Sequence, residues 1–175
     1  MPERRGWESM AKKKAEALRG LVSLRERPGF LVRRLHQIGI AIFTDEMAEL
    51  ELTPIQFGAM SIVGMKPGID QSALGEELGT DRANTTDVIN RLVNNGYVLR
   101  AVAPKDRRVR SIYLTDRGRD VVIVANGRLS KVRTRFLSPL KPGDREIFLD
   151  LMIELIEGNN SLGRAAWRFK TSSGA

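Results

Sequence analysis

Two short helical segments separated by a glycine turn most constrain what this chain can fold into. Asp70 caps a first predicted helix, which ends at Gly79. Thr80 or Asp81 caps a second predicted helix, which continues to Asn95. Two helices joined by such a tight turn form a helix-turn-helix pattern.

A predicted β-hairpin follows this pair of helices directly. The strands cover residues 97–103 and 109–114, with a turn at 104–107. Five basic residues and one acid lie along the hairpin: Arg100, Lys105, Arg107, Arg108 and Arg110 against Asp106. A basic tip can follow a nucleic-acid backbone and place an arginine in the minor groove, where negative potential is concentrated. Asp106 can orient Arg108 by a charge-assisted hydrogen bond. The alternative is a solvated, positively charged loop.

Four further helices are predicted, so the fold class is mainly α, or α+β once the hairpin is included. They cover residues 30–49, 54–66, 116–137 and 144–157, and the dipeptides Pro28-Gly29 and Pro142-Gly143 are interpreted as breaks. The helix over 30–49 carries two adjoining apolar rows, which suits a helix that also meets a second subunit.

The composition indicates an acidic partner and excludes several classes of protein. The 175 residues include 29 Lys+Arg and 21 Asp+Glu, a net charge of +8. There is no cysteine and only one histidine, which argues against disulfides, zinc fingers and a catalytic triad. We therefore predict no catalytic residues, no metal site and no cofactor. The N-terminus lacks a secretory pattern and no apolar run could span a membrane, so we expect a cytoplasmic protein without a membrane partner.

Three regions are predicted along the chain. Residues 1–27 form a basic N-terminal arm, in which 11–18 is either a short exposed helix or part of a disordered arm. Residues 28–157 form the folded domain, and residues 158–175 form a flexible basic tail.

The second helix of the pair has a polar outer face suited to the major groove. Unrolled at about 100° per residue, it turns Thr85, Val88, Ile89, Leu92 and Val93 inward. Side chains that can meet base edges or phosphates lie on or beside the opposite face: Arg82, Asn84, Thr86, Asp87, Asn90 and Arg91. The alternative is an ordinary solvated face.

Gln71 and Ser72, at the start of the preceding helix, are candidate phosphate contacts, although Ser72 can equally be a helix cap.

The order and spacing of five segments resemble the MarR family of bacterial transcription regulators. The segments are Leu52-Thr53-Pro54-Ile55-Gln56-Phe57, Leu74-Gly75-Glu76-Glu77-Leu78-Gly79, Arg91-Leu92-Val93-Asn94-Asn95-Gly96-Tyr97-Val98, Asp106-Arg107-Arg108 and Leu114-Thr115-Asp116-Arg117-Gly118. The resemblance covers about residues 28–157 and implies a winged helix-turn-helix with N- and C-terminal dimerisation helices. It also implies a homodimer on a palindromic double-stranded DNA operator, usually a repressor that a small, often aromatic, ligand releases.

The resemblance places the recognition segment at Arg82 to Arg91 and the wing tip at Asp106-Arg107-Arg108. Asp87 departs from relatives that have a basic residue there. Its carboxylate can accept a hydrogen bond from cytosine N4 or can repel phosphate.

The segment from Arg27 to Ile38 looks like a subgroup associated with aromatic-acid breakdown. In the family, the ligand pocket lies between the dimer helices and the winged domain. Candidate effector-binding residues are Arg33, Arg34, His36, Phe43, Phe57 and Met60. An arginine fork suits a carboxylate or phosphate, so an aromatic acid or an aromatic acyl-CoA thioester is the expected effector.

The alternative for these candidates is an ordinary structural role. His36 shares an apolar stripe with Val32, Ile40 and Phe43, which predicts a side chain at least half buried, and the aromatic residues and Met60 can simply be core. A constitutive accessory or architectural DNA-binding protein without a sensor is therefore the alternative function. An enzyme would need a nucleophile–base pair, metal-ligand spacing or a phosphate-binding loop, none of which is recognisable.

Overall fold

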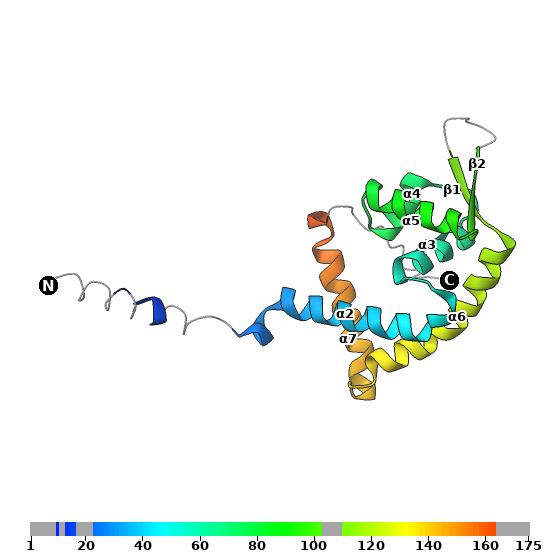
Figure 1. Cartoon of the computed structure of the whole chain (residues 1–175). Helices are drawn as coiled ribbons and strands as arrows, with labels where there is room; N and C mark the ends of the chain where they lie inside the picture. Colours follow the sequence, from blue (N-terminus) through cyan, green and yellow to red (C-terminus); the bar gives the residue numbers. More distant parts are fainter. Residues whose placement is uncertain (1–9, 11–12, 17–22, 103–109, 164–175) are drawn as a thin grey trace. The chain divides into compact units, whose positions relative to one another are not determined.

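The computed structural model describes residues 10, 13–16, 23–102 and 110–163. The chain divides into two compact units, Met1–Gly39 and Ile40–Ala175, and helix α2 (Pro28–Glu46) crosses the boundary between them (Figure 1). The predicted region boundaries after residues 27 and 157 stay predictions.

The unit Met1–Gly39 contains a short 3-10 helix, η1 (Leu24–Glu26), and the first part of α2. The Ser23 hydroxyl caps η1 by accepting a hydrogen bond from the Arg25 backbone N–H at 3.3 Å. Residues 13–16 are helical, in agreement with one of the two alternatives for 11–18, and the rest of that segment lies outside the described residues.

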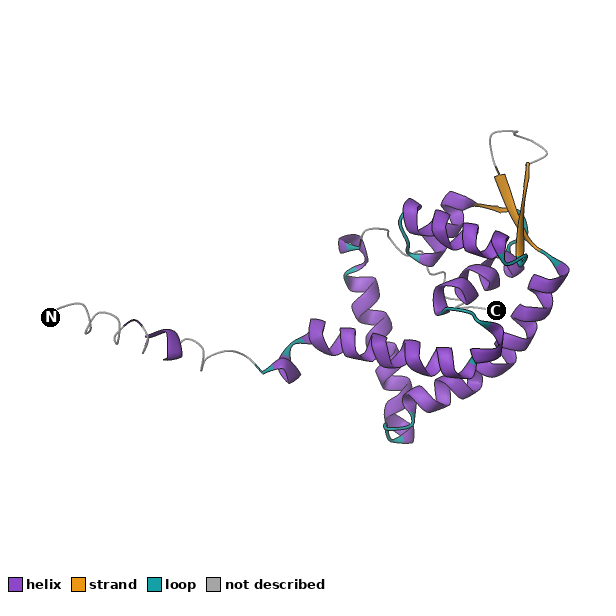
Figure 2. Ribbon diagram, viewed as in Figure 1, coloured by secondary structure: helices purple, strands orange, loops and turns teal. Residues whose placement is uncertain are grey.

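The described residues of the unit Ile40–Ala175 are mainly helical and form one small sheet (Figure 2). After the end of α2, its helices follow in the order η2 (Ala48–Leu50), α3 (Pro54–Met65), α4 (Gln71–Leu78), α5 (Arg82–Asn94), α6 (Asp116–Leu137), α7 (Pro142–Gly158) and η3 (Asn160–Leu162). Thr53, Asp70, Asp81 and Thr115 cap four of these helices through their side chains, so the predicted start signals are confirmed.

Three predicted helix boundaries were wrong. Helix α2 begins at Pro28 and α7 at Pro142, each two residues before the predicted start. Both prolines occupy the first helical turn, where the missing N–H has no intrahelical partner to lose, so they begin helices that we had expected them to interrupt. Helix α2 also ends at Glu46, before the predicted Glu49, because the chain turns into η2 where Met47 enters the core.

The sheet has the order β1-β3-β2 and is antiparallel throughout. The predicted hairpin is confirmed as β2 (Val98–Val102) and β3 (Arg110–Leu114), with Leu99 opposite Tyr113. Strand β1 (Ile69–Asp70) was not predicted; it pairs with β3 through Ile69 and Ile112. The sheet therefore ties the segment before α4 to the hairpin.

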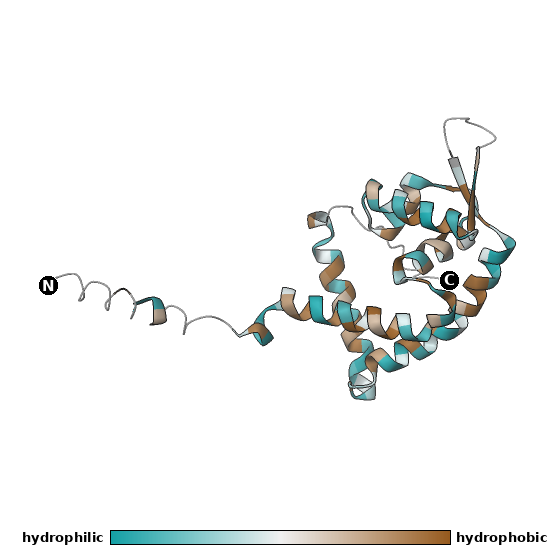
Figure 3. Ribbon diagram, viewed as in Figure 1, coloured by the Kyte–Doolittle hydropathy of each residue, from teal (hydrophilic) through white to brown (hydrophobic). Residues whose placement is uncertain are grey.

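The core lies where α3, α4, α5 and the sheet meet the end of α2 and the first half of α6. Its fully buried large side chains are Met47, Met60, Val63, Leu74, Thr85, Ile89, Leu92 and Ile112. Figure 1 shows these elements gathered at one end of α6, with α7 beginning at the other end. Hydrophobic residues also run along α7 (Figure 3), where no described side chain is buried.

Candidate nucleic-acid interface

Helices α4 and α5 form a closely packed helix-turn-helix. The Asp70 carboxylate accepts hydrogen bonds from the backbone N–H groups of Ser72 and Ala73 at 2.8 and 2.9 Å, and so holds the start of α4. Gly79, with a φ of 64°, ends α4 in the left-handed conformation that glycine adopts without strain. The cap of α4 is thus Asp70, and the alternative that Ser72 serves as a helix cap was wrong.

A glycine and two threonines set the distance between the two helices. A Cβ on Gly75 would lie 2.8 Å from the Thr85 hydroxyl oxygen, so only glycine permits this approach. The Thr85 hydroxyl donates to the Asp81 carbonyl at 2.7 Å and lies 2.8 Å from the Thr80 hydroxyl. Because the single Thr85 proton is already donated, Thr80 is the donor between the two hydroxyls.

Helix α5 buries the predicted side and exposes the predicted polar side. Thr85, Val88, Ile89 and Leu92 are buried, and Val93 is partly buried. The opposite side chains are exposed: Ala83, Asp87, Asn90, Arg91 and Asn94, with Arg82 and Asn84 beside them. The helix therefore presents a continuous row of hydrogen-bonding groups.

Neighbouring side chains hold three of the polar residues of α5. The Asn84 side-chain N–H donates to the Asp81 carboxylate at 3.0 Å. Gln71 of α4 donates to the Thr86 hydroxyl at 2.6 Å, and that hydroxyl donates to the Arg82 carbonyl. On the hairpin side, the Arg100 guanidinium of β2 donates to the Asn90 side-chain oxygen at 2.8 Å.

A groove of about 290 Å³ borders one edge of the exposed row. Asn84, Asp87 and Arg91 of α5 line it together with the start of α3 and the turn before α5, through Thr53, Ile55, Gln56, Thr80 and Val88. This edge of α5 is open, whereas the edge that carries Thr86 and Asn90 contacts α4 and β2.

The tip of the hairpin lies outside the described residues, and with it Lys105, Asp106, Arg107 and Arg108. Arg110 is described only in its backbone, as the first residue of β3, which pairs with Val102. The wing-tip assignments therefore stay predictions.

The base of the hairpin is firmly joined to α5 and α6. The Thr115 hydroxyl donates to the Gly96 carbonyl at 2.7 Å and accepts from the Gly118 N–H at 3.0 Å. The Arg117 guanidinium lies over the Tyr97 ring, 5.0 Å from its centroid. Thr115 thus links the end of α5 to the start of α6.

The candidate effector residues fall into the two units of the chain. Phe43, Phe57 and Met60 belong to the core of the unit Ile40–Ala175, where the two phenylalanine rings lie 6.1 Å apart between centroids. The other three, Arg33, Arg34 and His36, belong to the unit Met1–Gly39 and are exposed.

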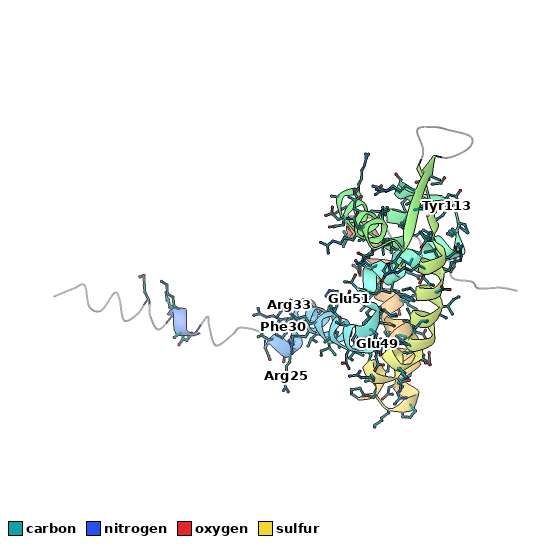
Figure 4. The ribbon with its side chains drawn as sticks, turned by 45° about the vertical axis from the view of Figure 1, so that its right-hand side comes forward. Arg25, Phe30, Arg33, Glu49, Glu51 and Tyr113 are labelled. Atoms are coloured by element: carbon teal, nitrogen blue, oxygen red, sulfur yellow. The ribbon has the colours of Figure 1, made fainter. Side chains whose placement is uncertain are left out.

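The expected burial of His36 was wrong, because the apolar stripe it shares with Val32 and Ile40 is itself exposed in the single chain. Both arginines of this stretch have a neighbour on the same helix. Arg33 lies over the Phe30 ring at 5.4 Å (Figure 4), and Arg34 donates to the Gln37 side chain at 3.0 Å.

Sequence reasoning missed an ion-pair cluster between the end of α2, η2 and α6. Arg135 contacts Asp45 and Glu46, both at 2.6 Å, and these carboxylates raise the pKa of Arg135. Arg128 contacts Glu49 at 2.5 Å, and its hydrogen bond lowers the pKa of the Glu49 carboxyl below its ordinary value. These partners lie about 80–90 residues apart in sequence, so no pattern within a short stretch of the chain predicts the ion pairs.

Within the described residues, no group of histidine and acidic side chains could hold a metal ion. Among the described helices, none has the length and hydrophobicity that a bilayer span requires.

Comparison with known proteins identifies the same arrangement in transcription regulators. A model described as the MarR family matches residues 50–109. The transcriptional regulator HosA of Escherichia coli O111:H- is 30% identical over 135 residues, which cover 77% of this chain and 98% of HosA. The HTH-type transcriptional repressor NicR of Pseudomonas putida is 26% identical over 141 residues, which cover 79% of this chain and 87% of NicR.

A solved structure agrees over the same extent. The PcaV transcriptional regulator of Streptomyces coelicolor, in complex with its natural ligand, matches with a TM-score of 0.73 and 30% identity, covering 79% of this chain and 97% of PcaV. Because HosA matches over nearly its whole length and the family model spans α3 to the hairpin, the chain is a transcription regulator and not an enzyme, and it belongs to the MarR family.

Proposed function

We propose that this protein is a ligand-responsive repressor that binds a palindromic DNA operator as a homodimer. The observation that carries the proposal is the exposed polar row of α5, set on a tightly capped α4. A helix held in this way can enter the major groove with its short side chains nearest the bases. The excess of positive charge over the whole chain, +8, favours attraction to the phosphate backbone.

Exposed apolar side chains on α2 and α7 support the homodimer. Those of α2 are Leu31, Val32, Leu35, Ile38 and Ile40, and those of α7 are Ile147, Leu151, Ile153, Leu155 and Ile156. Soluble proteins rarely leave so many large apolar residues on adjoining helical turns in water. A second copy of the chain, with the same two helices, is the partner that the family resemblance implies.

The proposed effector is an aromatic acid or an aromatic acyl-CoA thioester. Arg33 and Arg34 supply guanidinium groups that suit a carboxylate or a phosphate, and His36 lies exposed on the same helix. Among relatives, PcaV was solved with its natural ligand and NicR is named a repressor, which supports a ligand-responsive repressor here. A regulator of this kind acts on chromosomal DNA, so we place it in the cytoplasm.

The test is a two-step binding experiment. Duplexes are first selected from a random pool with the purified protein, and the affinity for the selected duplex is then measured by fluorescence anisotropy across salt concentrations. If a dimer neutralises roughly eight phosphates, log affinity falls with log salt with a slope of about −7. Failure to select any sequence would contradict the DNA-binding proposal.

The second step adds benzoate, a hydroxybenzoate or benzoyl-CoA at saturating concentration. We expect at least one of them to weaken operator binding by about tenfold, the size of an ordinary allosteric coupling. Arg33→Gln should remove the response while leaving operator affinity unchanged, with Arg25→Gln, an exposed arginine of η1, as the matched control. Operator binding that no compound alters would favour the constitutive accessory or architectural protein.

A further inference from the structure

The orientation of the Asn90 side chain is fixed by its partner on the hairpin. Arg100 donates from Nη2 to Asn90 Oδ1 at 2.8 Å. A guanidinium has only donors, so the asparagine must turn its oxygen toward β2. The two N–H groups of Asn90 are then left facing away from Arg100, on the exposed side of α5.

The orientation of Asn84 is fixed in the opposite sense. Asp81 accepts the Asn84 backbone N–H on Oδ1 at 2.9 Å and the Asn84 side-chain N–H on Oδ2 at 3.0 Å. A carboxylate has only acceptors, so the asparagine turns its nitrogen toward the cap and leaves Oδ1 available. Asp87, exposed between the two asparagines on the helix surface, is also an acceptor.

We propose that α5 carries a preset hydrogen-bond polarity, in which Asn84 and Asp87 accept and Asn90 donates. Asp81 and Arg100 impose this polarity as positioning residues, since each acts through an asparagine. The proposal rests on the proposed operator binding and specifies which base edges the helix selects.

The polarity restricts the bases that each asparagine can contact. An asparagine with both groups free pairs with adenine by accepting from N6 and donating to N7. Asn90, whose oxygen is turned toward Arg100 and has one lone pair left, presents its two N–H groups and favours guanine N7 or O6, thymine O4 or adenine N7. Asn84, whose nitrogen is turned toward Asp81 and has one N–H left, presents its oxygen and favours cytosine N4 or adenine N6. Each partner thus occupies part of the hydrogen-bonding capacity that the two-bond adenine contact uses and fixes the orientation of the amide, so that contact is disfavoured while the partner is bound.

Removing each partner should therefore alter the preference at one base position. In Arg100→Ala, the Asn90 oxygen is freed, so adenine should gain about tenfold over the other bases at the position that Asn90 contacts. In Asp81→Ser, the hydroxyl can still cap α5 but cannot also accept from the Asn84 side chain, so the adenine gain should appear at the Asn84 position instead. Arg133→Ala, which removes an exposed arginine of α6 paired with Glu146, is the charge-matched control and should leave all preferences unchanged.

The experiment measures the relative affinities of all single-base variants of the selected operator. Asn90→Ala and Asn84→Ala locate the two contacted positions. In the double variant Asn90→Ala with Arg100→Ala, the adenine gain should disappear, because Arg100 acts through Asn90. Thermal unfolding curves establish that each variant is folded.

Two results would overturn the inference. One is an equal loss of affinity on every sequence in Arg100→Ala, which would make Arg100 a phosphate contact alone. The other is an adenine gain that persists in the double variant. Both presuppose that the unchanged protein selects an operator, and failure at that earlier step would instead contradict the proposed function.

A second readout needs no DNA. In the NMR spectrum of the free protein, Arg100→Ala should shift the side-chain amide signals of Asn90 and leave those of Asn84 in place. Asp81→Ser should do the reverse. Unshifted Asn90 signals in Arg100→Ala would show that the contact does not orient the amide in solution.

Discussion

Replacing Gly118 by alanine is a sharp test of how α6 is joined to the DNA-binding elements. A Cβ at this position would lie 2.0 Å from the Tyr97 carbonyl oxygen and 2.9 Å from its carbon. Carbon and oxygen atoms ordinarily approach no closer than about 3.3 Å. Both obstructing atoms belong to the backbone, so no side-chain rotation can relieve the clash. Either the start of α6 or Tyr97, just before β2, must move by about 1.3 Å.

The expected change in the free energy of unfolding combines one stabilising contribution and two destabilising ones. Alanine gains about 1 kcal/mol over glycine within a helix. Overpacking a well-packed site costs about 1–3 kcal/mol. The Tyr97 carbonyl also accepts a hydrogen bond from the Thr115 N–H at 3.0 Å, and losing it costs about 0.5–1.5 kcal/mol. We expect Gly118→Ala to lower the free energy of unfolding by about 2 kcal/mol.

Gly127→Ala in the same helix is the matched control. Gly127 is exposed, and a Cβ there would have no neighbouring atom within 4 Å. This variant should gain up to about 1 kcal/mol of stability from helix propensity alone. Urea unfolding followed by far-UV circular dichroism measures both variants at one protein concentration, because the stability of the proposed dimer depends on concentration. If Gly118→Ala proved as stable as Gly127→Ala, the tight contact between α6 and Tyr97 would be refuted.

Three other perturbations address the dimer, the wing and acid stability. Leu151→Glu places a charge on the exposed apolar face of α7 and should convert the proposed dimer to monomers in sedimentation experiments, with operator binding lost. Arg108→Ala should weaken binding to all DNA sequences alike and reduce the magnitude of the salt slope by about one per protomer, whereas unchanged affinity would contradict the wing assignment. Glu49 has a lowered pKa in the fold, so its pairing with Arg128 stabilises the protein above the ordinary carboxyl pKa and is lost as the pH falls through the folded value. In Glu49→Gln, stability should therefore fall less steeply than in the unchanged protein as the pH is lowered below about 4.5. The measurement is the temperature of thermal unfolding as a function of pH.

Helix positions could be predicted where a local signal accompanies them. Thr53 followed by Pro54 combines a capping side chain with a residue suited to the first helical position, and Thr53 and Gln56 indeed form a reciprocal capping box. Pro28 and Pro142 begin helices without such a signal. Lys141, before the second, makes no capping hydrogen bond through its side chain. A proline alone does not distinguish the start of a helix from an interruption.

Strand β1 could not be predicted because its two residues are too few to show the alternation of apolar and polar side chains that indicates a strand. Its two residues become a strand only by pairing with Ile112 and Ser111, more than forty positions later. The same limit applies to the ion pairs of Arg128 and Arg135, whose partners come from α2 and η2. Such features depend on which elements the core brings together, and the core forms from the hydrophobic residues of the whole chain.

The exposed face of α5 was predictable, but what that face can bind depends on other elements. Helical periodicity separates Asn90 from the buried Ile89. It does not reveal that Arg100, ten residues later in β2, takes the oxygen of the Asn90 amide. Two relatives with the same α5 but different residues at positions 81 and 100 would therefore present different donors and acceptors to the DNA major groove. If the proposed polarity holds, comparing operators between relatives must include those two positions, because identity of α5 alone does not establish identity of the bases it would select.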